Sequence, residues 1–151
     1  MTIIDYHPDH KQAFYDLNIE WLETYFYVED VDREVLSNPD KYILKPGGRI
    51  FFALADGKAV GTVALMPHAE GGLELTKMAV DPQQRGKRIG QQLMQHCIDY
   101  AAEQQLPQLL LYSNRILENA IHIYRKFGFQ EVEQEKEVPY KRSNIKMVRK
   151  F

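Results

Sequence analysis

The first part of the chain alternates between apolar and polar positions in a way that predicts a short strand and two helices. The strand is expected over residues 3–6, and the helix after it carries apolar residues at helical spacing. Asp9 is the expected N-cap of this helix, because a short polar acceptor stands just before the apolar periodicity begins. A second, shorter helix is expected over 32–36 and ends before Pro39.

Between residues 50 and 80 the apolar period changes to that of strands. Three strands are expected, at 50–55, 59–65 and 73–80. Asp56-Gly57 is typical of a hairpin turn, and Glu70-Gly71-Gly72 predicts the next turn. Strict alternation over the third strand would place Glu74, Thr76, Met78 and Val80 on one face.

The second half of the chain predicts a strand–helix–strand crossover followed by a short helix and two strands. The expected elements are a helix from Ile89 to near Pro107, a strand at 109–113, a helix around 120–127 capped by Gly128, and strands at 129–132 and 145–151. This order predicts a single α/β (α+β) domain over residues 1–151. Its sheet should be mixed and mostly antiparallel, with six to seven strands and helices on both faces.

Composition narrows the class of protein. The 151 residues are 44% hydrophobic and 26% charged, which is ordinary for a globular domain. No apolar run approaches the roughly 20 residues of a membrane span, and the acidic start of the chain does not resemble a signal peptide. Cys97 is the only cysteine and lies on an apolar helix stripe, so we expect buried packing and a cytoplasmic location.

Charge and histidine content argue against several kinds of ligand. A net charge of −2 does not favour nucleic-acid binding, and the five histidines show no metal-ligand spacing, so we expect neither nucleic acid nor metal. The charge is uneven: residues 1–80 hold 13 acids and 7 bases, whereas residues 81–151 hold 8 acids and 12 bases. This asymmetry fits a cationic substrate on one side and an anionic cofactor on the other, or it is chance.

The segment from Val80 to Gly90 carries the strongest chemical signal. It joins a strand to the N-terminus of a helix, where free amides and the helix dipole bind phosphate. Its glycines permit close backbone approach, and three basic residues add positive charge. The alternative is an ordinary strand–helix turn with solvated basic residues. Other phosphate loops fit worse, because neither G-x-x-x-x-G-K-[ST] nor G-x-G-x-x-G is present.

This segment resembles the signature Q/R-x-x-G-x-G/A of the GNAT superfamily of N-acetyltransferases. Arg85 takes the first position and Gly90 the sixth, whereas Arg88 stands where the pattern has its central glycine. Two further segments resemble the same family: 74–82, which looks like its fourth strand, and 120–129, which reads Ala-Ile-His-Ile-Tyr-Arg-Lys-Phe-Gly-Phe. The detailed resemblance covers roughly residues 73–129.

The resemblance implies that acetyl-coenzyme A binds where strands four and five splay apart. The pantetheine arm would pair with the strand backbone, and the pyrophosphate would lie on the helix amides. The implied coenzyme-binding residues are Met78, Ala79, Val80, Arg85, Gly86, Lys87, Arg88, Ile89 and Gly90. Asn114 and Asn119 are further candidates, although either is equally well explained as a helix cap.

Acetyl transfer to an amine needs a base, a group that stabilises the oxyanion and a proton for the leaving thiolate. By resemblance, Tyr124 faces the coenzyme sulfur and supplies that proton; otherwise it is a core tyrosine. Glu74 is the candidate base, or else a solvated charge or a partner of Lys77. The backbone amide of Met78 or Val80 is the candidate for the oxyanion.

Aromatic and acidic residues cluster over 20–30. They would suit the wall of a site for a cationic amine, or they form an amphipathic helix with a solvated side. The residues are Trp21, Tyr25, Phe26, Tyr27, Glu20, Glu23, Glu29 and Asp30.

The sequence therefore predicts an N-acetyltransferase that moves an acetyl group directly from acetyl-coenzyme A to a primary amine in a ternary complex. The acceptor would be a small molecule or an amine of a peptide or protein, and a homodimer is possible by resemblance. Two other hypotheses stay open. One is a non-catalytic acyl-coenzyme A sensor, and the other is a structural domain that has lost the coenzyme.

Overall fold

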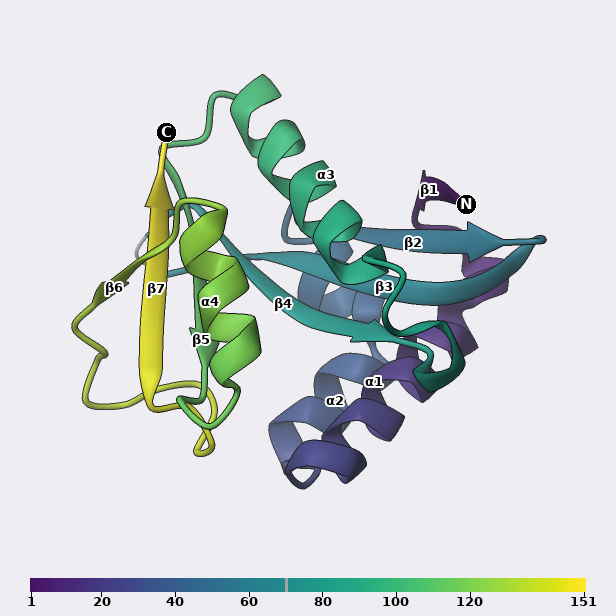
Figure 1. The fold of residues 1–151 in the computed structure, drawn as a ribbon, viewed down its shortest axis with the longest axis horizontal. Helices are drawn as coiled ribbons and strands as arrows, with labels where there is room; N and C mark the ends of the chain where they lie inside the picture. Colours follow the sequence, from purple (N-terminus) through teal and green to yellow (C-terminus); the bar gives the residue numbers. More distant parts are fainter. Residues whose placement is uncertain (70) are drawn as a thin grey trace.

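In the computed structural model, which describes residues 1–69 and 71–151, seven strands form one sheet in the order β1-β2-β3-β4-β5-β7-β6 (Figure 1). Neighbouring strands pair antiparallel except β4 and β5, which pair in parallel. The predicted mixed, mostly antiparallel sheet is confirmed. The strands are β1 (Thr2–Asp5), β2 (Arg49–Ala55), β3 (Lys58–Pro67), β4 (Leu73–Val80), β5 (Gln108–Ser113), β6 (Gln130–Val132) and β7 (Ile145–Lys150).

Helices cover both faces of the sheet, as the order of elements predicts (Figure 1). One layer holds the first two helices and the other holds α3 and α4. A short 3-10 helix precedes α1, and a π-helical turn at Asp40–Leu44 leads into β2. The helices are α1 (Lys11–Tyr25), α2 (Asp30–Ser37), α3 (Ile89–Glu103) and α4 (Glu118–Lys126).

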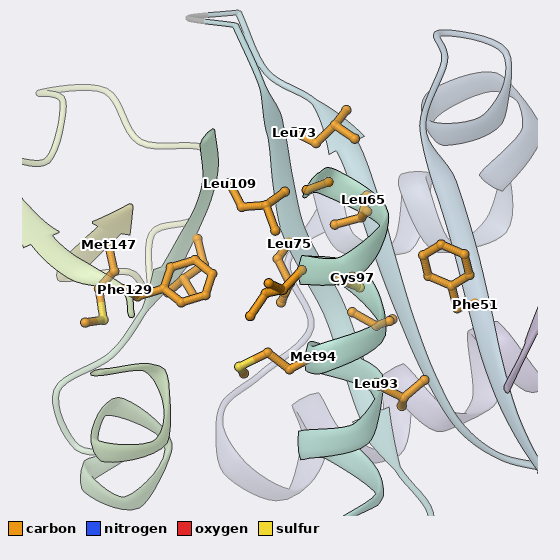
Figure 2. Close-up of a cluster of buried hydrophobic side chains, with 14 of the residues drawn as sticks. Phe51, Leu65, Leu73, Leu75, Leu93, Met94, Cys97, Leu109, Phe129 and Met147 are labelled. Carbon is orange, nitrogen blue, oxygen red and sulfur yellow. The ribbon is translucent and has the colours of Figure 1, made fainter. Parts of the chain in front are cut away.

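Two apolar clusters hold these layers together. Beneath α3, the side chains of Leu93, Met94 and Cys97 pack on β2–β5 and β7 (Figure 2). Leu93 and Met94 each stabilise the fold by roughly 1.5–3 kcal/mol through this burial. Cys97 is fully buried and burial raises the pKa of its thiol, so the predicted packing role is confirmed. Phe14 and Phe52 lead the second cluster, beneath α1 and α2.

The N-terminal ends of the first two helices differ from the prediction. Asp9 is not the N-cap of α1, because it lies inside the 3-10 helix Pro8–His10, whose cap is His7: Nδ1 of His7 accepts from the Asp9 backbone N–H at 3.1 Å. The second helix begins at Asp30 rather than 32, because Glu29 and Asp32 form a reciprocal capping box. Periodicity alone does not locate such caps.

A β-bulge in β4 corrects the prediction that Glu74, Thr76, Met78 and Val80 share one face. The register shifts between Thr62 and Ala64 of β3, and Lys77 has a φ of 55°. This extra residue reverses the alternation. Leu75 before the bulge and Met78 and Val80 after it therefore all pack against the α3 cluster, whereas Glu74 points to the opposite side.

The sheet opens next to the bulge. Within the described residues, β4 and β5 pair only through Leu73 with Leu109 and Glu74 with Leu110. β3 stays paired with β4 as far as Val80, so the second half of β4 has a partner on one side only. The predicted hairpin at Asp56-Gly57 is confirmed; of the turn predicted at 70–72, Glu70 lies outside the described residues. No helix among the described residues is long and apolar enough to cross a membrane.

Candidate active site

A pocket with about 900 Å³ of space free of protein atoms lies where β4 leads into α3. The loop after β4 and the first turn of α3 form one wall, and α4 forms the other. The first amides of α3 have no partner within the helix and carry its positive dipole end. The residues that line this pocket include Met78, Val80, Arg85, Gly86, Arg88, Ile89, Gly90, Asn119 and Tyr124.

The glycines of this loop leave room for a ligand beside the backbone. A Cβ added at Gly86 would meet no atom within 4 Å, and its φ of 87° favours glycine. A Cβ added at Gly90 would approach Met78 Sδ at 3.6 Å, which is ordinary contact with the protein, so Gly90 serves to open the pocket rather than to relieve crowding. An anionic ligand therefore fits the cradle of glycines, amides and basic residues.

Arg88, which stands in place of the central glycine of the family pattern, has a backbone conformation that favours glycine. It is the N-cap of α3 and has φ 60° and ψ 25°, which is the left-handed conformation. Such a conformation costs a non-glycine residue about 1 kcal/mol or more. The side chain is exposed and lines the pocket. The arginine therefore retains the turn and adds a cation at the pocket.

The other two basic residues of the loop are held by neighbours. Nη2 of Arg85 lies 2.9 Å from Oε1 of Glu20 on α1, and its guanidinium stands 5.6 Å from the ring centre of Tyr25. Lys87 Nζ donates to the Gln84 side chain at 2.8 Å. Glu20 is thus tied to the loop instead of being a free part of an acidic wall.

A second pocket, with about 720 Å³ of space free of protein atoms, lies in the gap between β4 and β5. Trp21 and Phe26 line it from the end of α1, with ring centres 5.8 Å apart. Tyr25 and Tyr27 are instead exposed, as are Glu23 and Asp30. Of the predicted aromatic and acidic wall, the structure brings only the first two rings to this pocket.

Met78 and Tyr124 line both pockets and so mark where they meet. Tyr124 projects from α4, and its ring packs edge-on against Phe129 at 6.3 Å. Burial raises the pKa of its hydroxyl, and a hydrogen bond with Ser113 offsets only part of this effect. The hydroxyl is therefore protonated at neutral pH and available as a donor.

A buried ionic cluster borders the second pocket, and two of its members, Lys77 and Arg142, line that pocket. Arg142 donates from Nη1 to Asp32 Oδ2 at 2.7 Å and from Nη2 to Oδ1 at 2.9 Å. Lys77 Nζ lies 3.4 Å from Asp32 Oδ1, and both side chains are almost fully buried. Burial acts to raise the pKa of Asp32, but its hydrogen bond with Arg142 and the two positive charges hold it below its usual value.

Glu29 extends this cluster to the surface of α2. Its carboxylate accepts from Arg142 Nη1 at 2.8 Å and from the Lys141 backbone N–H at 3.0 Å. The segment between β6 and β7 is thereby fixed against α2, and this closes one side of the second pocket. Glu29 is therefore held by structural partners and is not a free acidic residue in the wall of an acceptor site, as one sequence hypothesis expected.

Glu74 lies behind the second pocket. Its side chain is buried, and Tyr140 Oη donates to its Oε2 at 2.9 Å. Burial raises the pKa of Glu74 despite the nearby charge of Lys77 and the Tyr140 hydrogen bond, which lower it. Glu74 is thus neither a solvated charge nor a group that an acceptor in the pocket can touch. Its role as base stays a prediction.

The structure separates the remaining predicted residues. Asn119 faces the first pocket, whereas Asn114 lines the second, donates to the Arg142 carbonyl at 2.7 Å and accepts from the Ile116 N–H at 3.0 Å. Neither is a helix cap, since Leu117 holds that position at α4. Among the described residues predicted to hold the coenzyme, Ala79 and Lys87 do not line the first pocket.

Sequence reasoning missed four residues at this site: Asp32, Lys77, Tyr140 and Arg142. Lys77 inside a strand with buried apolar residues was the one available signal, because a buried cation requires a partner. The other three lie on a helix start and in a segment without periodicity. Within the described residues, no group of three or more His, Cys, Asp or Glu side chains is arranged to hold a metal ion.

The sheet that opens between β4 and β5 is the feature implied by the resemblance to N-acetyltransferases of the GNAT superfamily. Comparisons with known proteins agree with this class. A family model described as "Acetyltransferase (GNAT) domain" matches residues 46–131. Mouse N-acetylaspartate synthetase is 30% identical over 108 residues, which are 70% of this chain and 36% of that enzyme. The chain thus spans about a third of this relative's length.

Solved structures agree in fold. A GNAT-family acetyltransferase from Staphylococcus aureus Mu50 superposes with a TM-score of 0.87 at 23% identity, covering 99% of this chain and 98% of the other. PaiA N-acetyltransferase from Thermoplasma acidophilum, solved in complex with coenzyme A, gives 0.73 at 18% identity and covers 100% of both. The chain belongs to the GNAT acetyltransferase family, and the resemblance seen in the sequence is confirmed.

Proposed function

We propose that this protein is an acetyl-coenzyme A-dependent N-acetyltransferase that acts by direct transfer to a primary amine in a ternary complex. The observation that carries the proposal is the meeting of two pockets at Met78 and Tyr124. One pocket offers helix amides and basic side chains to an anionic coenzyme. The other offers aromatic and polar side chains to an acceptor.

The residues of the first pocket would hold the coenzyme by its phosphates. The amides from Arg85 to Gly90 and the exposed Arg88 supply positive charge, and the half-paired end of β4 supplies free backbone groups. The acyl end would then lie beside the bulge, where both pockets meet. The Met78 amide is our candidate for the group that stabilises the oxyanion.

In the proposed reaction the amine nitrogen attacks the thioester carbonyl, and the carbon–sulfur bond breaks. The amine loses one proton, and the thiolate gains one. Tyr124 is suited to the second of these transfers, since its hydroxyl keeps its proton at neutral pH. Acetylation of an amine agrees in general terms with the name of the mouse relative, N-acetylaspartate synthetase.

Thiol release from acetyl-coenzyme A, measured against a panel of amines, tests the proposal. The panel should hold amino acids, polyamines, aromatic amines and peptides. We expect release that depends on one class of amine, together with saturable coenzyme A binding by calorimetry. Binding without release with any amine would favour a non-catalytic sensor, and no binding would leave a structural domain. We also propose a cytoplasmic location, on the ground of the single, buried Cys97.

A further inference from the structure

Tyr140 is the residue that connects the second pocket with the buried carboxylate of Glu74. It lies in the segment between β6 and β7 and is 6% exposed, yet it lines the pocket. Its ring is fixed by two cations, with Lys77 Nζ 4.5 Å and the Arg142 guanidinium 4.8 Å from the ring centre. The side chain is therefore held in one place before any ligand arrives.

The hydroxyl of Tyr140 bridges the pocket wall and Glu74. It donates to Glu74 Oε2 at 2.9 Å and lies 3.2 Å from Thr76 Oγ1, which also lines the pocket. Glu74 is only 4% exposed and is not among the residues that line the pocket. A proton that leaves a molecule in the pocket can reach Glu74 along this bridge.

We infer that Tyr140 contacts the acceptor amine and passes its proton to Glu74, an inference that rests on the proposed function. As the proton leaves the ammonium nitrogen for Tyr140 Oη, the phenolic proton moves from Oη to Glu74 Oε2. Tyr140 ends as it began, and Glu74 becomes a neutral acid. The freed nitrogen lone pair then attacks the thioester, and Glu74 releases its proton to solvent before the next cycle.

The environments of Glu74 and Tyr140 suit each residue to its role in the proton relay. Burial raises the pKa of Glu74, which makes it a stronger base than an exposed glutamate. Burial also raises the pKa of Tyr140, so the phenol keeps a proton and acts as a bridge instead of a resting base. Among the described residues, the charged or titratable groups that face the pair are Lys77 from β4, Asp32 from α2, Tyr112 from β5, Arg142 from the β6–β7 segment and His68 next to β3.

Movement of the Thr76 side chain can free a hydrogen-bond acceptor site on Tyr140 for the amine. Its side chain interacts with the Glu74 carboxyl as well as with Tyr140. A phenol oxygen accepts at most two hydrogen bonds, and Tyr140 Oη already accepts from Lys77 Nζ at 3.4 Å and lies within hydrogen-bond distance of Thr76. When Thr76 turns toward Glu74, an acceptor site on Tyr140 Oη becomes free for the incoming amine, while Tyr140 still donates to the carboxylate.

Kinetics of Tyr140→Phe, Glu74→Gln and the double variant test this relay. Each single change should lower kcat by ~10²–10⁴-fold, the usual contribution of acid–base catalysis. Because both changes break one chain, the double variant should be no slower than the slower single variant. Acetyl-coenzyme A affinity, measured by calorimetry, should stay within about twofold, and Tyr100→Phe, which removes only the hydroxyl that accepts from Arg49 Nε, should match the wild type.

The pH profile separates a relay from a merely structural role. In the wild type, kcat should fall as pH drops through the raised pKa of Glu74, because a protonated carboxyl accepts no proton. This acidic limb should be missing in Glu74→Gln. Wild-type turnover that survives Tyr140→Phe, or single effects that multiply in the double variant, would overturn the relay and leave the proposed function intact. A wild type that binds the coenzyme but turns over no amine would overturn both.

Discussion

Asp32→Asn should destabilise the fold strongly although it changes a single atom. Asparagine keeps the size of the side chain and still accepts the Glu29 backbone N–H that completes the capping box. It removes the one negative charge that lies between Lys77 and Arg142. Lys77 is 8% exposed and would be left as a poorly compensated buried cation.

The expected loss is about 3–5 kcal/mol, the usual cost of removing one partner from a buried ion pair. For a domain of this length, each kcal/mol lowers Tm by about 2–4 °C, so Tm should fall by about 6–20 °C. Urea unfolding followed by the fluorescence of Trp21, the only tryptophan, measures the same loss. Glu131→Gln removes an exposed ion pair with Arg115 and serves as the matched control, with no measurable change expected.

The effect of Asp32→Asn should also depend on pH. The folded-state pKa of Asp32 is lower than the unfolded one, so its stabilisation is fully present above about pH 3.9 and disappears as pH falls through the folded value. The two proteins should therefore differ fully at pH 7 and converge in acid. Adding Lys77→Met should recover part of the loss, since it removes the stranded cation. Equal urea midpoints for Asp32→Asn and Glu131→Gln at pH 7 would refute this reasoning.

Three further predictions concern the first pocket, where we propose that the coenzyme binds. Tyr124→Phe should bind acetyl-coenzyme A normally but lose turnover by about tenfold or more in the thiol-release assay; unchanged turnover would remove the hydroxyl from the mechanism. Arg88→Gly should relieve the left-handed strain and, after the entropy cost of glycine, raise stability by about 0.5–1 kcal/mol in urea, while coenzyme binding becomes less sensitive to salt. A lower urea midpoint would contradict this. Gly61→Ala should cost about 1–3 kcal/mol and weaken coenzyme binding measured by calorimetry, because its Cβ would stand 3.0 Å from Ile89 Cγ2 and 3.2 Å from Leu93 Cδ1; wild-type affinity would show that α3 does not shift.

Local patterns predicted most of the fold. The strand 73–80 has its predicted bounds, and Gly128, with a φ of 95°, follows the last turn of α4 as expected. These features depend on neighbours in sequence. The bulge at Lys77 broke the prediction for the faces of β4, because it arises from pairing with β3 and leaves no mark in the alternation of residue types.

Most of the lining of the first pocket, where we propose that the coenzyme binds, was predictable because its residues are nearly contiguous and resemble a known pattern. The second pocket was not. Arg142 and Asp32 are 110 positions apart, and Tyr140 and Glu74 are 66 apart. Arg142, Asp32 and Tyr140 each read as an ordinary polar residue in their own segments, and only Glu74 was singled out, by resemblance. Only the closure of the β6–β7 segment over α2 brings them together, and a single sequence holds no signal for that contact.

The short β4–β5 pairing gives this domain a thermodynamic link between occupancy and folding. Two strands that stop sharing hydrogen bonds midway leave backbone groups that water or a bound molecule must pair with. A ligand that binds there and ignores the unfolded chain raises the unfolding free energy by about 2.7 kcal/mol at one hundred times its Kd. The unfolding free energy of the domain would then rise and fall with the concentration of its co-substrate.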